Sequence, residues 1–355
     1  MKKPLCFITF TVLSLLLLAC SQLGYYSQSI SGHLTIMSAR RPIEEMLSDP
    51  NVAAELKEKL VRAVAYRRYA TESLYLPEND SYLSYADTGR SAALWNIVAA
   101  PDDSLVPKQW CFVIAGCLPY RGYYDQTEAN VYAGRLTAEG YDVKIYAVPA
   151  YSTLGWFDDP LLNTVIDLPE WGLAGIIFHE LAHQLVYVQD DAIFNEAFAQ
   201  MVEEEGVRRW LAAYGTDEIR ATFQRSETRQ AGFRALLQQT RGALAACYAT
   251  DREHAARIAC KEEVLDRMQL QYAELKESWG GYAGYDGWFR SRPNNASFVS
   301  AQTYRHYLPA FERVLQEQNG DLKLFYAEVK RLAALSFQER KEVMDRLLTR
   351  DDEPF

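Results

Sequence analysis

One short segment in the middle of the chain, HELAH at positions 179–183, constrains the fold and the chemistry more than any other. It follows the apolar run from Leu173 to Phe178, and a run of this kind predicts a buried helix. Positions four apart lie on one face of a helix, so His179 and His183 can bind one metal ion. Glu180 then lies beside the ion without binding it, where a general base for a water molecule is needed. The pattern predicts a metal-binding helix with a catalytic carboxylate.

A second motif, NEAFA at positions 195–199, offers a third ligand for such an ion. A catalytic zinc takes three protein ligands and keeps a fourth position open for water. The motif resembles the third-ligand sequence of the gluzincin peptidases, which combine two His with a Glu from a second helix. The resemblance implies that His179, His183 and Glu196 hold one zinc ion per chain and that Glu180 is the base.

The spacing between the two motifs leaves an alternative open. Twelve residues separate His183 from Glu196, fewer than in the familiar gluzincins, so residues 189–192 must form a tight turn between two helices. Glu203 lies nearer the usual distance and two helical turns beyond Glu196 on the same face. Glu203 is therefore either a rival third ligand or a residue that supports the site without binding the ion.

The amino terminus has the pattern of a lipoprotein signal peptide. A basic start, MKK, precedes an apolar stretch from Phe7 to Leu18, which is short for a membrane span and usual for a signal-peptide core. The stretch ends in LLAC at 17–20, which resembles the bacterial lipobox. The resemblance implies removal of residues 1–19 and a lipid on Cys20. A transmembrane anchor and an ordinary signal peptide are the alternatives.

The residue after that cysteine, Ser21, bears on the compartment. By resemblance to enterobacterial lipoproteins, a Ser rather than an Asp at this position implies sorting to the outer membrane. More than one acyl chain makes such an anchor stable. The sequence therefore predicts a chain held on the outer membrane by the lipid on Cys20 and facing the periplasm.

The cysteine count agrees with export. Of six cysteines, one lies in the predicted signal peptide and Cys20 is assigned to the lipid. The four that remain are Cys111, Cys117, Cys247 and Cys260. An even remainder in an oxidising compartment predicts two disulfides, and sequence proximity favours the pairs 111–117 and 247–260 over the two other pairings. Free buried thiols are the alternative.

The net charge argues against nucleic acid as a partner. Loss of Lys2 and Lys3 with the signal peptide lowers Lys+Arg from 37 to 35 against 47 Asp+Glu, a net charge of −12. The chain has no run of Lys and Arg and no nucleic-acid motif. The expected partners are a peptide or protein substrate and the membrane, while no pattern indicates an oligomeric state.

The order of the predicted elements gives an α+β fold. Its centre is a zincin-like catalytic core, a small sheet beside the active-site helix, with predominantly helical parts before and after it. Helical spacing in the last part includes Leu244–Cys260 as one segment. The chain divides into a signal peptide at 1–19, a tether at 20–33, helices with an aromatic-rich region at 34–125, the metal-binding core at 126–210 and a helical region at 211–355.

Two predicted elements lead into the metal helix, a helix at 129–139 and a strand at 142–148. The segment from Ala150 to Trp156 lies between this strand and the metal helix. Zincin catalytic domains bind extended substrate along the edge strand of a small sheet. The segment is therefore either that edge and the rim of the site or an ordinary connecting loop.

Several blocks together resemble one bacterial family of predicted zinc aminopeptidases. They are the lipobox, the segments at 110–123 and 150–157, the metal motif, and NNA at 294–296 before Tyr304. The likeness covers nearly all the mature chain. It implies a zinc peptidase, in which Glu180 takes a proton from an activated water and passes it to the leaving amine.

Two further roles, the oxyanion donor and the carboxylate that binds the substrate ammonium, have several candidate residues each. Related gluzincins stabilise the developing oxyanion with a Tyr or a His, and the candidates are Tyr304, His306 and Tyr151. An aminopeptidase also needs a carboxylate for the substrate ammonium, and Asp158 and Asp159 are either that anchor or turn residues. An endopeptidase or amidase on envelope peptides, or a non-catalytic scaffold held by its metal, are the alternatives to an aminopeptidase.

Overall fold

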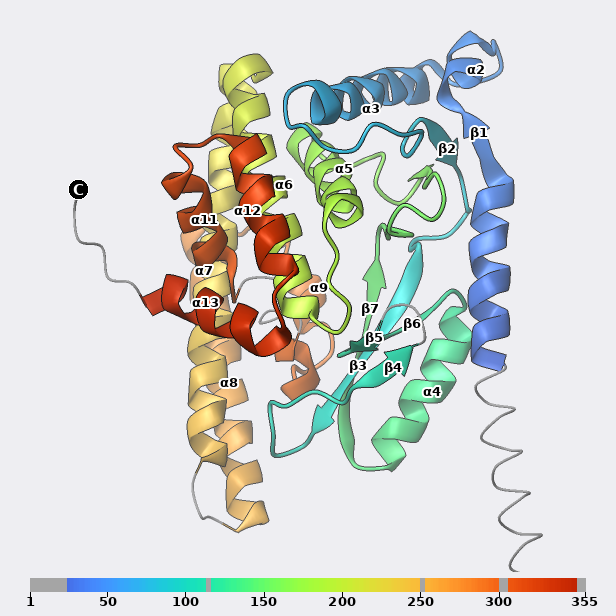
Figure 1. The fold of residues 1–355 in the computed structure, drawn as a ribbon. Helices are drawn as coiled ribbons and strands as arrows, with labels where there is room; N and C mark the ends of the chain where they lie inside the picture. Colours follow the sequence, from blue (N-terminus) through green and yellow to red (C-terminus); the bar gives the residue numbers. More distant parts are fainter. Residues whose placement is uncertain (1–23, 113–115, 250–252, 300–305, 350–355) are drawn as a thin grey trace, which may run out of the picture.

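The protein is an α+β structure in which long helices surround small sheets (Figure 1). The computed structural model describes residues 24–112, 116–249, 253–299 and 306–349. The predicted α+β class is confirmed, since the chain is largely helical with small sheets. The predicted signal peptide, Cys20 and Tyr304 lie outside the described residues.

Short strands dominate the first half of the chain and helices the second. The strands are β1 (Arg40–Pro42), β2 (Ser84–Ala86), β3 (Leu94–Pro101), β4 (Trp110–Phe112), β5 (Gly116–Leu118), β6 (Arg121–Tyr123), β7 (Tyr141–Val148) and β8 (Leu161–Leu162). The helices are α2 (Ile43–Ser48), α3 (Ala54–Glu72), α4 (Gln126–Ala138), α5 (Glu170–Leu185), α6 (Ala192–Tyr214), α7 (Asp217–Tyr248), α8 (His254–Ser278), α9 (Asp286–Phe289), η1 (Asn295–Phe298), α11 (Leu308–Glu317), α12 (Leu322–Ala333) and α13 (Phe337–Thr349). Within the described ranges, no helix combines the length and the apolarity that crossing a membrane requires.

A further helix, residues 24–39, begins inside the segment predicted as a tether. Distant contacts hold it: the Tyr25 ring centroid lies 3.9 Å from the guanidinium carbon of Arg121. The side-chain oxygen of Gln28 accepts the backbone N–H of Tyr124. The tether prediction is wrong for this part, because tertiary contacts stabilise a helix in a segment rich in Ser and Gly, which do not favour one.

The central sheet has the strand order β6-β3-β7 and is antiparallel throughout. Its register places Trp95 between Tyr123 on β6 and Ala147 on β7. α4 packs against this sheet and lies beside it in Figure 1. The predicted helix at 129–139 and strand at 142–148 are thus present as α4 and β7.

The segment that follows β7, residues 150–156, is a loop. Leu154 and Gly155 have φ angles of 57° and 81°, and this left-handed conformation interrupts an extended strand. The edge-strand interpretation of this segment is therefore wrong, and the connecting-loop interpretation holds. The edges of the central sheet are β6 and β7.

The largest hydrophobic core surrounds α5 and α6. Phe178 on α5 and Phe198 on α6 are fully buried. The two helices approach closely because Gly206 presents only hydrogen to the Phe178 ring. α3 covers α5 from one side, and α11 packs on α6 from the other. The metal motif therefore sits on the most deeply packed helix pair of the described chain.

The long helices α7 and α8 fold back on each other around a separate core. The prediction of one helical segment from Leu244 to Cys260 is wrong, because α7 ends at Tyr248 and α8 begins at His254. Folding back lets both helices bury one apolar face, which a single continuous helix could not do here. The favoured disulfides, 247–260 across this hairpin and 111–117 between β4 and β5, are both present.

Replacing Gly206 by Ala should destabilise the protein, because a Cβ there would lie 2.7 Å from Phe178 Cδ2 and 2.8 Å from Leu74 Cδ1. Overpacking of this kind lowers the free energy of unfolding by about 1–3 kcal/mol. Urea unfolding monitored by circular dichroism measures the change. The control is Gly134→Ala on the exposed side of α4, where nothing lies within 4 Å and stability should rise by about 0.5–1 kcal/mol. Equal stabilities of the two variants would contradict the close approach of α5 and α6.

Candidate metal centre

α5 presents the HELAH motif in its last two turns. The helix begins after Pro169, whose missing N–H costs no helical hydrogen bond at that place. It ends at Leu185, because the β-branched Val186 is extended with φ −144°. The rings of His179 and His183 lie 4.9 Å apart, centroid to centroid. The motif therefore places both imidazoles on one face of α5, as its spacing predicts.

The turn between α5 and α6 sets the position of the third acid. Asn195 accepts a hydrogen bond from the backbone N–H of Val188 at 2.8 Å and donates one to its carbonyl at 2.7 Å. Asp190 adopts a left-handed φ of 65° inside the turn. The predicted tight turn at 189–192 is present, and the two hydrogen bonds of Asn195 close it. The neighbouring Glu196 is thereby brought against α5.

Three ligand atoms converge between the helices. Glu196 Oε2 lies 3.5 Å from His179 Nε2 and 3.7 Å from His183 Nε2, and all three atoms lie within 4.8 Å of one another. Tetrahedral ligand atoms around a zinc ion, at bonds of about 2.0–2.1 Å, lie about 3.4 Å apart. The residues present therefore fit a zinc ion with small side-chain movements.

Glu203 lies on the other side of His179 and not in this group. Its Oε2 is 3.0 Å from His179 Nδ1, the nitrogen that points away from the ligand cluster. Gly175 makes room for this carboxylate, since a Cβ there would lie 3.1 Å from Glu203 Cγ. Of the two acids between which the sequence left a choice, Glu196 converges with the imidazoles and Glu203 orients one of them.

The charges of the site act on the two histidines in opposite directions. Burial disfavours the charge on His179, but hydrogen bonds to Glu196 and Glu203 outweigh it and raise the pKa of His179 well above its usual value. Burial dominates at His183 and lowers its pKa to about 4. Without an ion, His179 therefore carries protons on both nitrogens, one toward each carboxylate. A cation at Nε2 would replace one of these protons and keep the hydrogen bond to Glu203.

Glu180 is a half-buried carboxyl beside the cluster. Burial raises its pKa to about 7, and the negative charges of Glu196 and Asp159 add to this effect against the opposing influence of His179. A general base works best when its pKa lies near the working pH. The electrostatic environment of Glu180 therefore suits proton transfer near neutrality.

Tyr120 follows β5 and lies within electrostatic range of the site, because the negative charges of Glu196 and Glu180 both act on its hydroxyl. Burial and these charges raise the pKa of Tyr120 well above its usual value, so the hydroxyl stays protonated and can donate. Tyr120 was not among the residues predicted from the sequence. The only local signal was its place in the Cys-rich block at 110–123, since no spacing rule links it to α5.

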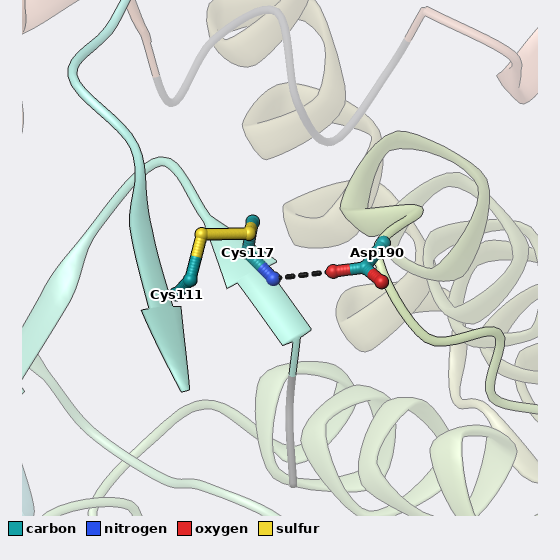
Figure 2. Close-up of a disulfide and its surroundings, with 3 residues drawn as sticks. All are labelled: Cys111, Cys117 and Asp190. Carbon is teal, nitrogen blue, oxygen red and sulfur yellow. Dashed lines mark hydrogen bonds between the residues drawn. A yellow bond between two sulfur atoms is a disulfide. The ribbon is translucent and has the colours of Figure 1, made fainter. Parts of the chain in front are cut away.

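The β4–β5 hairpin holds the backbone ahead of Tyr120 in place. The disulfide between Cys111 and Cys117 joins its two strands, and the backbone N–H of Cys117 donates to Asp190 Oδ1 at 2.5 Å (Figure 2). Gly116 allows this approach, because a Cβ there would lie 2.2 Å from the same oxygen. The hairpin is thus fastened to the turn between α5 and α6, next to the ligand cluster.

A second group of polar atoms lies near Glu180. Tyr82 and Asp159 are buried, and both lie within electrostatic range of Glu180. In the described part of the chain, the Tyr82 hydroxyl and Asp159 Oδ1 have no hydrogen-bond partner. Burial raises the pKa of Asp159 to about 6. Asp158, the other predicted amine anchor, is exposed.

Of the predicted oxyanion donors, Tyr151 lines a small cavity together with Tyr82 and Asp159. Its hydroxyl lies 2.9 Å from His33 Nδ1 on the first helix. His306 is exposed just before α11, and Tyr304 lies outside the described residues. Tyr120, unlike Tyr151, has a hydroxyl on which the charges of both Glu180 and Glu196 act.

Another cluster of potential ligands, Asp102, Asp103 and His254, lies at the surface. Both acids of this cluster already pair with basic side chains. Arg257 is 2.8 Å from Asp103, and His254 Nε2 is 3.1 Å from Asp102 Oδ1. This cluster is an ion-pair group that links the β3–β4 connection to α8, and it gives no reason to expect an ion.

The fold and the site define an α+β protein with a largely buried His-His-Glu group that could hold a metal ion, beside the half-buried carboxyl of Glu180. A family model described as "Putative aminopeptidase" matches residues 24–344, so the chain belongs to this family. The match supports a peptidase, and hence a hydrolase, as the broad class. The chain has no significant match among curated proteins or among solved structures.

The two acids should differ in their effect on zinc content. Glu196→Ala should abolish the stoichiometric zinc, because one of three converging ligand atoms is lost. Glu203→Ala should bind one zinc per chain at saturation with about 10–100-fold lower affinity, since it only orients His179. Elemental analysis and a competitive chelator titration measure stoichiometry and affinity. Full zinc in Glu196→Ala with none in Glu203→Ala would reverse the assignment.

Proposed function

We propose that the protein is a zinc-dependent aminopeptidase with a zincin-like core made of the central sheet and α5. The observation that supports this most is the convergence of one carboxylate oxygen and two imidazole nitrogens beside the half-buried Glu180. A purely structural site gains nothing from an unbound carboxyl at that place. The family of the chain supports the same class of reaction.

The donor set favours zinc among the common divalent ions. Two imidazoles and one carboxylate suit zinc, whereas magnesium and calcium prefer oxygen ligands. His179, His183 and Glu196 would hold the ion, and Glu203 fixes the ring of His179. When bound, the ion would lower the pKa of a water molecule and polarise the scissile carbonyl.

The residues of the chain supply the proton transfers. Glu180 accepts the proton of the attacking water and delivers it to the leaving amine as the peptide bond breaks. The Tyr120 hydroxyl donates a hydrogen bond to the carbonyl oxygen as negative charge develops on it. The raised pKa of Tyr120 keeps this donor protonated over the range in which Glu180 with a pKa of about 7 can act as base.

Glu180→Gln keeps the shape of the side chain and removes the base. Hydrolysis of peptides should fall by at least about 10²-fold, while zinc content stays at one per chain. Turnover and elemental analysis on the same preparation test this. Glu170→Gln, in the first turn of the same helix, is the matched control and should retain activity. Unchanged turnover in Glu180→Gln would exclude the mechanism.

Tyr120→Phe removes one hydroxyl and should lower kcat by about 10²–10³-fold, with KM and zinc content little changed. Tyr146→Phe is the control, because the Tyr146 hydroxyl bonds to Asn96 and is affected by Glu196 but not by Glu180. Steady-state kinetics on one peptide substrate compare the two. An equal loss in both variants would mean that Tyr120 has only a structural role.

Specificity for a free amino terminus is the finer part of the proposal. Asp159 Oδ1 is a buried acceptor without a described partner, close to Glu180 and to the Tyr82 hydroxyl. An ammonium group would supply the missing donor and favour the ionised form of Asp159. We assign Asp159 as the anchor for the amino terminus of the substrate.

Asp159→Asn should raise KM for peptides with a free amino terminus by about tenfold or more, since an ionic hydrogen bond becomes a neutral one. Zinc content should not change. Asp158→Asn, one residue away and exposed, is the control and should leave KM unchanged. Acetylated peptides should be poor substrates for the parent enzyme. Rapid internal cleavage of acetylated peptides would instead identify an endopeptidase.

The same proposal includes lipid attachment at Cys20 and a location at the outer membrane facing the periplasm. The sequence before Cys20 supports attachment, and two disulfides suit an oxidising compartment. The first described helix begins at residue 24, so the folded protein starts close behind the lipid.

A further inference from the structure

The first helix, residues 24–39, carries an exposed apolar stripe. Tyr26, Ile30 and Leu34 are 36%, 60% and 57% exposed. Their spacing of four places them in one line along the helix. The exposed side chains beside this line are small and uncharged, Ser27, Ser31, Thr35 and Ser38. A soluble surface gains nothing from such a stripe, so a partner for it is expected.

The stripe is held facing outward by the opposite side of the helix. Ile36 is fully buried, and a Cβ on Gly32 would lie 2.2 Å from Tyr124 Cγ, which marks a close approach. His33 Nδ1 lies 2.9 Å from the Tyr151 hydroxyl. These contacts fix the rotation of the helix, and the stripe therefore cannot turn inward to join the core.

The position of the helix in the chain identifies the partner. Only residues 21–23 lie between Cys20 and the first described residue of the helix, a distance of at most about 14 Å for a fully extended chain. The sequence from Pro4 to Ala39 contains no Asp, Glu, Lys or Arg, and two exposed residues follow directly, Arg40, which donates to the carbonyl of Asp158, and Arg41, which pairs with Asp49. An uncharged surface that ends in basic residues suits the boundary between acyl chains and anionic headgroups.

We propose that the stripe of Tyr26, Ile30 and Leu34 lies in the surface of the lipid bilayer and fixes the orientation of the protein on the membrane. This inference rests on the proposed lipid at Cys20 and is independent of the peptidase activity. The lipid supplies the anchor, and the stripe adds a second apolar contact about 12 Å long, from Tyr26 to Leu34. The chain would thus lie on the membrane through one defined face instead of hanging freely from its lipid.

The test uses the processed, acylated protein in phosphatidylethanolamine–phosphatidylglycerol vesicles that contain a phospholipid with a photoreactive diazirine in its acyl chain. After irradiation, mass spectrometry locates the adducts. Adducts are expected on Tyr26, Ile30 and Leu34. Val61 on α3 and Val131 on α4, 54% and 53% exposed, are matched aliphatic controls and should carry none.

The double variant Ile30→Asn, Leu34→Asn should lose the adducts on the helix and keep its activity on a soluble peptide. The matched variant Val61→Asn, Val131→Asn should keep both the adducts and the activity. Thermal unfolding verifies that both are folded. An acylated chain whose stripe is unlabelled, or labelled no more than Val61 and Val131, would overturn the inference and leave the peptidase proposal intact. Absence of an acyl group on Cys20 would overturn the anchor and the inference together.

Discussion

Two hydrogen bonds between the Asn195 side chain and the backbone of Val188 are the interaction on which the site depends. They close the short turn between α5 and α6, and they do so from the residue immediately before Glu196. Helix geometry then fixes the direction of the Glu196 side chain toward the imidazoles. The close approach at Gly206 completes the arrangement, because it sets the distance between the helices. A longer turn would need a different residue to serve as third ligand.

The electrostatics of the site are compatible with a bound cation. Glu196 and Asp159 are buried close to the half-buried Glu180, and their negative charges raise the pKa of Glu180 beyond the effect of burial alone. In the absence of an ion, protonated His179 supplies the main positive charge among them. Several buried carboxylates with one compensating imidazolium are costly to keep ionised. A divalent ion supplies more charge at the same place and frees His179 to act as a neutral ligand.

The sequence reveals those parts of the site that local spacing encodes. The interval of four between the histidines and the Asn-Glu motif predict the residues that converge, and Glu203 falls into the supporting role that was its alternative. Tyr120 and the buried position of Asp159 could not be predicted, because they depend on how the sheet and the loop after β7 pack on α5. The helix at 24–39 was missed for the same reason. Its composition favours a flexible segment, and only contacts with distant residues stabilise it.

The disulfide at the base of the β4–β5 hairpin has a consequence for the strand that leads to Tyr120. Its cysteines are only six residues apart, so the bond adds little to global stability compared with one that closes a long loop. What it secures is local, the strand that bonds to Asp190 and leads to Tyr120 (Figure 2). In a reducing environment this bond would break. The core around α5 and α6 would stay folded, whereas the strand that leads to Tyr120 would no longer be held in place. Reduction of this one bond would therefore act on the strand between Asp190 and Tyr120 and leave the packing of α5 on α6 unchanged.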